Sequence, residues 1–345
     1  MNIPSTVLIL GARGRFGLAA ARAFAAAGWR VLAQMRPGSA GPAVPGVQWL
    51  AVALEDSAAL AALAQGAQVV VHALNPRYTR RAWRAQVPAL MHASIRVSRA
   101  LGATLMLPGN VYNFGASMPE LLREDTPQQA RGVMGRARIA LEQQLEHATR
   151  GGDLKAVVIR AGDFFGSGTG SWFDQLLAKD LRRGKFTYRG PFDVPTAWAY
   201  LPDLASTFAR VAARRDQLPA FEVLHFAGHS LTGQQWVALL TPVAREQGWV
   251  PRSAPLRTGS LPVPLLRLGG LVMPTWAALG DTLYLWSTPH RLANDRLTAL
   301  IGQEPHTPLP EAVRSALAGL GMLLPVKTGD SPAACYAELA EVERR

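Results

Sequence analysis

The chain has 345 residues, of which 49% are hydrophobic, and a formal net charge of +12. A chain of this length and apolar content can bury a large core and can divide into two domains. Arginine carries most of the positive charge, since lysine occurs only at positions 155, 179, 185 and 327. No block of lysine and arginine resembles a nucleic-acid-binding arm, so we expect no nucleic-acid partner.

The cysteine content and the apolar segments indicate the compartment. Cys335 is the single cysteine, so no intrachain disulfide can form, which fits a reducing cytoplasm. The first apolar run reads as a strand with no basic segment before it, unlike a signal peptide. The later apolar stretch 268–280 contains Pro274 and is shorter than the roughly 20 residues of a membrane-spanning helix. We expect a soluble cytoplasmic protein without a membrane partner.

Residues 6–17 predict a dinucleotide-binding turn. An apolar strand ends in Gly11, Gly14 and Gly17, and an alanine-rich helix is predicted over 18–27. The first glycine allows a sharp turn, the second lets backbone N–H groups approach a pyrophosphate, and the third lets the helix lie close to the strand. Unpaired N–H groups at the helix start favour phosphate there. A tight turn without a ligand is the alternative.

Apolar strands and helices alternate after this turn, which is the pattern of an α/β fold with a doubly wound parallel sheet. The predicted strands are 29–35, 47–53, 68–73, 103–107, 156–160 and 221–227, and the predicted helices are 57–64 and 86–101, with Pro88 in the first turn of the second helix.

The end of the second strand predicts the nucleotide. An acidic residue there would bond both ribose hydroxyls and favour NAD, whereas an arginine accommodates the 2′-phosphate of NADP. No Asp or Glu occurs between Trp29 and Val52, and Arg36 follows the strand. Arg13, inside the glycine turn, can approach the same point. We predict NADP rather than NAD as the cofactor; the alternative is that both arginines are simply exposed.

The GxxGxxG spacing resembles the extended branch of the short-chain dehydrogenase/reductase superfamily, the NAD-dependent epimerase/dehydratase family. This resemblance implies a Rossmann-like doubly wound parallel sheet with a smaller C-terminal substrate-binding cap. Together with the strand ends, it predicts cofactor contacts from Gly11, Ala12, Arg13, Gly14, Arg15, Phe16, Gly17, Arg36, Ala53, Leu54, Ala73, Leu74, Asn75, Pro108, Gly109, Arg138, Ala161 and Gly162.

The segments that carry the family's catalytic residues are recognisable, but the residues differ. In the family, the fifth strand ends in Ser/Thr-x-x-Val-Tyr-Gly and a later helix carries Tyr-x-x-x-Lys. With Val111-Tyr112 as the anchor, Pro108 takes the Ser/Thr position, Met134 the tyrosine position and Arg138 the lysine position. Methionine has no proton to transfer, and a guanidinium with a pKa above about 12 does not exchange one. The usual acid/base mechanism is therefore absent.

Four residues remain candidates for the catalytic site. Asn110 could orient a substrate carbonyl, and Tyr112 could donate a proton. Arg138 could bond the nicotinamide ribose hydroxyls. Asp163 could act as a base if burial raises its pKa. No Cys/His spacing predicts a metal site.

The resemblance extends to segments 160–166, 198–205, 294–297 and 307–313. It implies an NADP-binding Rossmann domain over 1–165 plus about 196–227, a discontinuous cap over about 166–195 plus 228–330, and a tail over 331–345. The cap is rich in aromatic residues, most of which we expect in its core. Its basic residues Arg182, Arg183, Lys185 and Arg189 are expected at a solvated surface, with an anionic substrate as the alternative.

Two functions are compatible with these observations. The first is an atypical NADP(H)-binding epimerase/reductase-like oxidoreductase that acts on a small carbonyl or sugar-type substrate without the Ser-Tyr-Lys triad. The intact cofactor turn and the full cap favour it. The second is a non-catalytic NADP(H)-sensing regulatory protein, which the loss of all three catalytic groups favours. We prefer the first. The resemblance also implies a homodimer through helices near 86–101 and 130–147.

Overall fold

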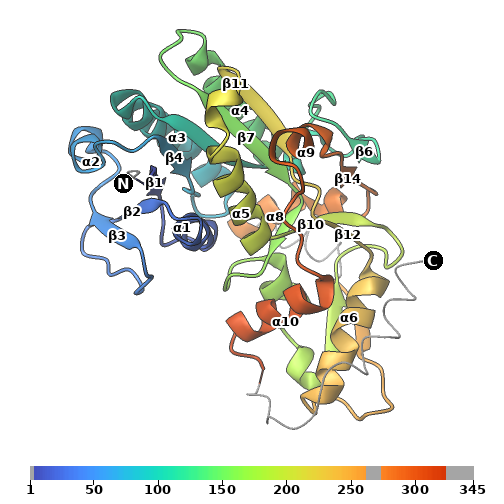
Figure 1. Ribbon diagram of the computed structural model, residues 1–345. Helices are drawn as coiled ribbons and strands as arrows, with labels where there is room; N and C mark the ends of the chain where they lie inside the picture. The colour runs from blue at the N-terminus through green and yellow to red at the C-terminus, as the bar shows by residue number, and fades with distance from the viewer. Residues whose placement is uncertain (1–3, 262–272, 324–345) are drawn as a thin grey trace.

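The central sheet consists of seven parallel strands (Figure 1). The structure is a computed structural model, and it describes residues 4–261 and 273–323. Their order is β11-β7-β5-β4-β1-β2-β3. Successive strands therefore leave β1 first on one side and then on the other, and ligands of such sheets bind at this reversal, beyond the carboxyl ends of the strands. The strands are β1 (Thr6–Leu10), β2 (Arg30–Met35), β3 (Val47–Ala51), β4 (Val69–His72), β5 (Thr104–Asn110), β7 (Ala156–Ala161) and β11 (Phe221–His225).

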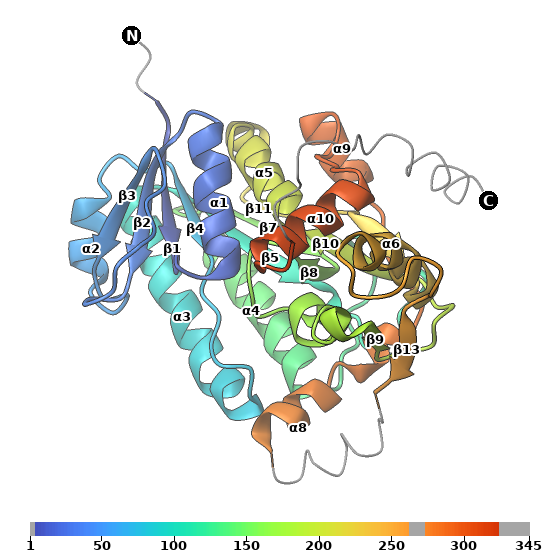
Figure 2. The same ribbon diagram turned by 90° about the horizontal axis from the view of Figure 1, so that it is seen from below.

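Helices cover both faces of the central sheet (Figure 2). Side chains alternate across a strand, so Val7 and Ile9 of β1 belong to one core cluster while Leu8 and Leu10 belong to the other. One face carries α1 (Arg15–Ala26), α5 (Leu201–Ala212) and α9 (Asp295–Ile301); the other carries α2 (Ser57–Leu63), α3 (Arg80–Leu101) and α4 (Val133–Thr149). This confirms the predicted Rossmann-like α/β fold.

The predicted start of α3 is wrong. The helix begins at Arg80, where the Thr79 hydroxyl accepts a hydrogen bond from the Ala82 N–H at 3.2 Å. Pro88 therefore lies inside the helix and not in its first turn. Trp83 and Val87 are buried in the core, and their packing stabilises the two turns that precede the proline.

The rest of the described chain forms smaller sheets and helices. The three-stranded sheet contains β8 (Asp163–Phe165), β10 (Thr196–Tyr200) and β12 (His229–Leu231). Two pairs are β9 (Lys185–Tyr188) with β13 (Arg257–Ser260), and β6 (Leu121–Leu122) with β14 (Arg291–Leu292). The further helices are α6 (Gly233–Glu246), α8 (Pro274–Gly280) and α10 (Leu309–Gly319). Short helical turns cover Val111–Asn113, Phe173–Leu177, Leu181–Arg183, Arg215–Gln217 and Leu283–Trp286.

Several sequence predictions concern residues outside the described ranges or boundaries that the structure leaves open. Cys335, the tail 331–345 and residues 268–272 of the apolar stretch lie outside the described residues. The domain boundaries stay a prediction: β10, expected in the Rossmann domain, pairs with β8 and β12, whereas α5 and β11 return to the central sheet. Within 4–261 and 273–323, each helix is too short or too polar to cross a lipid bilayer.

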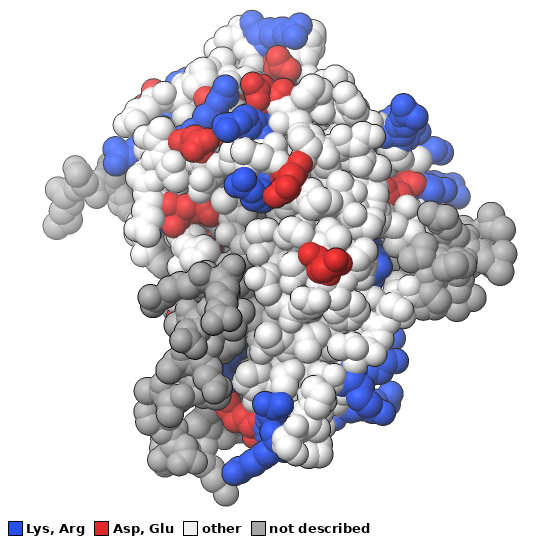
Figure 3. Space-filling view, turned by 90° about the vertical axis from the view of Figure 1, so that its right-hand side faces the viewer, with Lys and Arg blue, Asp and Glu red and all other residues white. Residues whose placement is uncertain are grey.

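Charged residues are interspersed over the face shown in Figure 3. Acidic and basic side chains alternate there across a largely uncharged surface. Some of the arginines form surface ion pairs with carboxylates, such as Arg123 with Asp295 at 3.3 Å. Exposed pairs of this kind contribute at most about 1 kcal/mol each.

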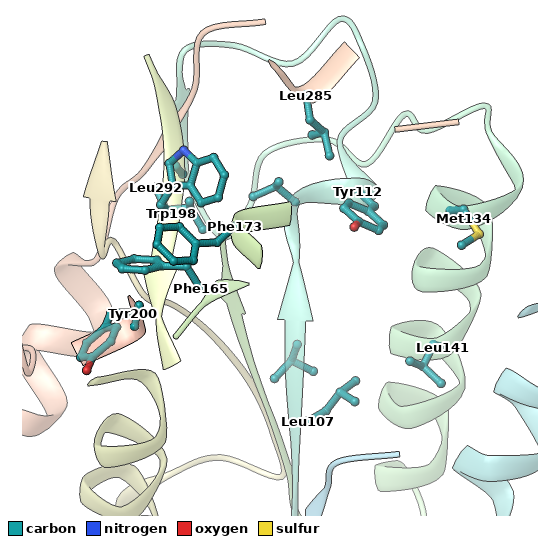
Figure 4. Packing of buried hydrophobic residues seen from close by; sticks show 14 of the residues in the cluster. Leu107, Tyr112, Met134, Leu141, Phe165, Phe173, Trp198, Tyr200, Leu285 and Leu292 are labelled. Carbon is teal, nitrogen blue, oxygen red and sulfur yellow. The ribbon is translucent and has the colours of Figure 1, made fainter. Parts of the chain in front are cut away.

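Aromatic side chains pack the three-stranded sheet against its neighbours. The ring centroids of Phe165 and Trp236 lie 5.5 Å apart, and those of Trp198 and Trp236 lie 5.0 Å apart. Figure 4 shows Phe165, Phe173 and Trp198 facing one another at this sheet. Most of the predicted cap aromatics are core residues, as expected.

A buried ion pair fixes α4 against the central sheet. Arg160 of β7 and Glu142 of α4 have side chains that are 2% and 5% exposed, and their closest atoms lie 2.7 Å apart. The Arg160 guanidinium also donates to the Glu124 carbonyl at 3.1 Å. The pair sets the position of α4, and thereby of Arg138, which lies one turn before Glu142.

We expect Arg160→Met to lower the free energy of unfolding by about 3–5 kcal/mol, because Glu142 would keep a buried charge without a partner. Chemical denaturation measures the change. The double variant Arg160→Met/Glu142→Leu should recover most of the loss, since it removes both charges. The surface control Arg123→Met should change the free energy by less than about 1 kcal/mol. A double variant as unstable as the single one would contradict this role.

Candidate functional site

A cleft of about 1250 Å³ opens at the carboxyl ends of β1, β2, β4 and β5. Small-molecule pockets are usually about 300–1,000 Å³, so the cleft suits an extended ligand. Of the residues predicted to contact a cofactor, it is lined by Gly11, Arg13, Gly14, Arg15, Phe16, Arg36, Ala53, Leu54, Ala73, Leu74, Asn75, Pro108 and Arg138. The other predicted residues, Ala12, Gly17, Gly109, Ala161 and Gly162, are not part of its lining.

The three glycines differ in their surroundings. Gly11 has a φ of +73°, which a glycine adopts freely. A Cβ on Gly17 would lie 2.6 Å from the Gly11 carbonyl oxygen, so only glycine lets α1 approach β1 this closely. Gly14 lines the cleft at the start of α1, and no side chain caps that helix. The N–H groups of the first turn are therefore available to an anion.

Gln34 holds the glycine turn in place, and the sequence prediction missed it. Its side-chain carbonyl accepts a hydrogen bond from the Gly11 N–H at 2.9 Å, and its amide donates to the Val52 carbonyl at 2.7 Å. The residue is 2% exposed. The sequence offered one signal for this role: Gln34 is the one amide side chain inside the otherwise largely apolar strand 30–35.

The cleft is rich in positive charge. Glu55 is the one carboxylate in its lining, against five guanidinium groups. Arg13 lies in the turn after β1 and Arg36 directly follows β2, and both are exposed. The arginines of the lining are Arg13, Arg15, Arg36, Arg77 and Arg138. Such a lining fits the phosphate groups of a nucleotide.

Of the three residues predicted at the triad positions, Pro108 and Arg138 line the cleft and Met134 does not. Arg138 donates to the Pro108 carbonyl at 3.3 Å, and its guanidinium carbon lies 5.1 Å from the centroid of the Trp83 ring. Met134 is fully buried in the core. Figure 4 shows it on the first turn of α4, near Tyr112 at the end of β5. The structure thus brings Pro108 and Arg138 together and leaves Met134 out of the cleft.

Tyr112 and Asn110 lie outside the cleft lining and have structural partners. The Tyr112 hydroxyl is 3.4 Å from that of Tyr78, which lies 3.4 Å from the Thr282 hydroxyl. Burial raises the pKa of Tyr112 well above its ordinary value. The Asn110 side-chain carbonyl accepts the Tyr112 N–H at 3.0 Å. The catalytic roles of both residues therefore stay predictions.

Asp163 is partly exposed beside the cleft, next to the lining residue Phe164. Its carboxylate accepts a hydrogen bond from the Trp286 indole N–H at 2.7 Å. Burial raises its pKa above the ordinary carboxyl value, and Arg189, Trp286 and Arg15 offset this shift only in part. A raised pKa is the property that the sequence prediction required of Asp163 as a base.

Comparison with known proteins places this geometry among related folds. The NAD dependent epimerase/dehydratase family matches residues 7–226. Among solved structures, the UDP-glucose 4-epimerase of Thermotoga maritima, with UDP-glucose, is similar at 15% identity and a TM-score of 0.70, covering 91% of this chain and 98% of that one. The UDP-Glc/GlcNAc 4-epimerase of Campylobacter jejuni is similar at 14% identity and a TM-score of 0.69, covering 91% of this chain and 98% of that one.

A third similar structure contains a nucleotide. WbmH of Bordetella bronchiseptica, in complex with NAD+, matches at 18% identity and a TM-score of 0.66, covering 92% of this chain and 98% of that one. At these identities the likeness shows the fold. No curated protein sequence matches the chain significantly.

We expect Gln34→Leu to lower the free energy of unfolding by about 2–4 kcal/mol, because it leaves the Gly11 N–H and the Val52 carbonyl without partners. Urea denaturation measures the change. Gln48→Leu on the exposed side of β3 is the matched control and should stay within about 0.5 kcal/mol of the parent. Equal effects of the two substitutions would show that Gln34 does not hold the turn.

Asp163→Asn should raise the melting temperature at pH 7, and the gain should shrink as the pH falls toward 4. The folded-state pKa of Asp163 is raised above its ordinary value of 3.8. The contribution of protonated Asp163 to the free energy of unfolding is therefore present at acid pH. It is lost as the pH rises through the folded-state pKa, because the buried carboxyl group then becomes charged. Thermal unfolding at several pH values tests this, with the exposed Asp153→Asn as control. A gain independent of pH would contradict the assignment.

Proposed function

This chain belongs to the NAD dependent epimerase/dehydratase family, and we propose that it is an atypical oxidoreductase that binds NADP(H). Its substrate would be a small carbonyl or sugar-type compound, handled without a Ser-Tyr-Lys triad. The observation that carries the proposal is the arginine-lined cleft at the uncapped start of α1. The free N–H groups of the first turn and the guanidinium groups of the lining fit the pyrophosphate of a dinucleotide.

The proposal specifies NADP(H), which carries a 2′-phosphate, rather than NAD(H). WbmH was solved with NAD+, and the family is described as NAD dependent. In this chain, however, the cleft lining beyond β2 contains Arg36 with Pro37 and Ser39, and no carboxylate up to Glu55. A guanidinium there favours a 2′-phosphate over a bare ribose hydroxyl. Arg13 lines the same cleft and provides a second donor.

The chain's own residues suit a reaction that does not need a tyrosine acid. A bound nicotinamide would supply hydride exchange. Arg138, fixed by the Pro108 carbonyl and the Trp83 ring, would orient ribose hydroxyls at the inner end of the cleft. Asp163, whose pKa is raised by burial, would hold or accept the proton. Loss of a dedicated acid typically costs about 10²–10⁴ in rate, which an activated substrate tolerates.

A non-catalytic NADP(H) sensor is the second candidate. The fully buried Met134 favours it, because a core methionine occupies the position of the family's tyrosine. Transfer of isotope to and from the nicotinamide, assayed across carbonyl and sugar compounds, separates the candidates. The oxidoreductase should transfer label with at least one compound. A panel that never exceeds background would favour the sensor.

Arg36→Ala should weaken NADPH binding by about 1.5–3 kcal/mol, the contribution of a charge-assisted hydrogen bond, and should leave NADH binding nearly unchanged. Calorimetric titration with NADPH, NADP+, NADH and NAD+ measures this. Arg22→Ala, on the exposed side of α1, is the control and should change neither affinity. Equal losses for NADPH and NADH would show that Arg36 does not contact the 2′-phosphate, and a parent protein that binds no dinucleotide would refute the proposed function.

A further inference from the structure

A buried arginine, Arg189, interacts with the same carboxylate, Asp163, as Arg15 does. Arg189 follows β9 and is 5% exposed, contrary to the expected solvated surface, whereas its neighbours Arg182, Arg183 and Lys185 are exposed. Its guanidinium carbon lies 4.0 Å from the centroid of the Trp172 ring and 4.6 Å from that of Trp286. The two indole rings therefore hold the guanidinium and fix its orientation.

Most of the hydrogen-bonding capacity of Arg189 is unused. Its Nη2 donates to the Thr282 carbonyl at 3.2 Å, while Nε and Nη1 are buried without a hydrogen-bond partner among the described residues. A guanidinium has five N–H donors, arranged as two forks that share Nη2. Thr282 uses one hydrogen of Nη2, so one complete fork of two N–H groups remains. Such a fork matches a carboxylate or a phosphoryl group.

The charges around Arg189 favour an anion. Within the described ranges, no carboxylate lies within 4.0 Å of it. Asp163 is the nearby carboxylate, and it interacts with Arg15 as well as with Arg189. The other ionisable neighbours of Arg189 are Tyr78, Tyr112 and Tyr188, which are neutral at pH 7. Arg15 interacts with Asp174 as well as with Asp163. Asp163 is therefore the one carboxylate that acts on Arg189, and it is shared with a second guanidinium group.

The cluster adjoins the cleft. Asp163 and Trp172 are partly exposed, as is Tyr78. In the segment between Asp163 and Trp172, the residues Phe164, Thr169 and Gly170 line the cleft. An unpaired guanidinium this deeply buried costs free energy unless a ligand satisfies it. Among the described residues no carboxylate satisfies it, since Asp163 is bonded to the Trp286 indole instead.

We propose that Arg189, held between Trp172 and Trp286, binds an oxyanionic group of the substrate, either a carboxylate or a phosphoryl group. The substrate of the oxidoreductase is then an anionic carbonyl or sugar compound. This assignment of the substrate class rests on the proposed function, whereas the anion site itself does not require a nucleotide.

Three hexoses that differ at one carbon test the site: glucuronate, glucose 6-phosphate and glucose. They are titrated into the full chain without nucleotide, followed by tryptophan fluorescence and calorimetry. At least one of the two anions should bind about tenfold or more tightly than glucose, and it should change the emission of the indoles beside Arg189. Preference for glucuronate assigns a carboxylate, and preference for glucose 6-phosphate assigns a phosphoryl group.

Variants locate the effect. Arg189→Gln should abolish the preference for the anion, and Arg189→Lys, which keeps the charge without the fork, should retain only part of it. Arg183→Gln, an exposed arginine of the same segment, is the matched control and should keep the full preference. Asp163→Asn should strengthen anion binding, because it removes the carboxylate that faces Arg189, and it decides the matter if Arg189→Gln does not fold.

Equal affinities for the three hexoses, or an anion preference that survives Arg189→Gln, would overturn the inference. So would weaker anion binding in Asp163→Asn. Titration with NADPH distinguishes this failure from that of the proposed function. NADPH binding without an anion preference refutes the anion site alone, whereas an anion preference without NADPH binding refutes the proposed oxidoreductase and leaves the site in place.

Discussion

The close approach of α1 to β1 is the constraint on which the cleft depends. Any side chain at Gly17 would meet the Gly11 carbonyl and the Ala12 backbone, so the helix can lie this close only because the position is a glycine. The N-terminus of α1 is thereby directed at the end of β1, where the strand order reverses. Gln34 then fixes the turn from the other side through the Gly11 N–H and the Val52 carbonyl. Helix, turn and neighbouring strands form one rigid anion-facing unit.

A second constraint fixes the helix that carries Met134 and Arg138. The buried pair of Glu142 and Arg160 determines where α4 lies against β7. Positions 134 and 138 are on the same helix but take no part in that pair. They can therefore change without moving the helix. Arg138 keeps a cation at the inner end of the cleft, and Met134 joins the hydrophobic core instead.

The elements that the sequence predicted well are those that local chemistry determines. The strand, glycine and helix pattern of 6–27 depends on neighbouring residues, and it placed the turn correctly. The start of α3 was missed because Pro88 looks like a first-turn residue, whereas burial of Trp83 extends the helix before it. Gln34 was missed because its partners, Gly11 and Val52, directly follow two other strands, β1 and β3. The burial of Arg189 depends on Trp172 and Trp286, from distant segments, so no local pattern could reveal it.

The two arginine environments differ in how they would recognise the anions proposed for them. Arg13 and Arg36 are exposed in the lining of the cleft, where water screens a guanidinium and a phosphate gains selectivity mainly from hydrogen-bond geometry. Arg189 is buried between indole rings, where screening is weak and an unpaired charge is costly. The phosphate of the proposed nucleotide suits the first environment, because both arginines there are open to solvent. A small anion that has to be held in one orientation suits the second, because the rings already fix the guanidinium before the anion arrives.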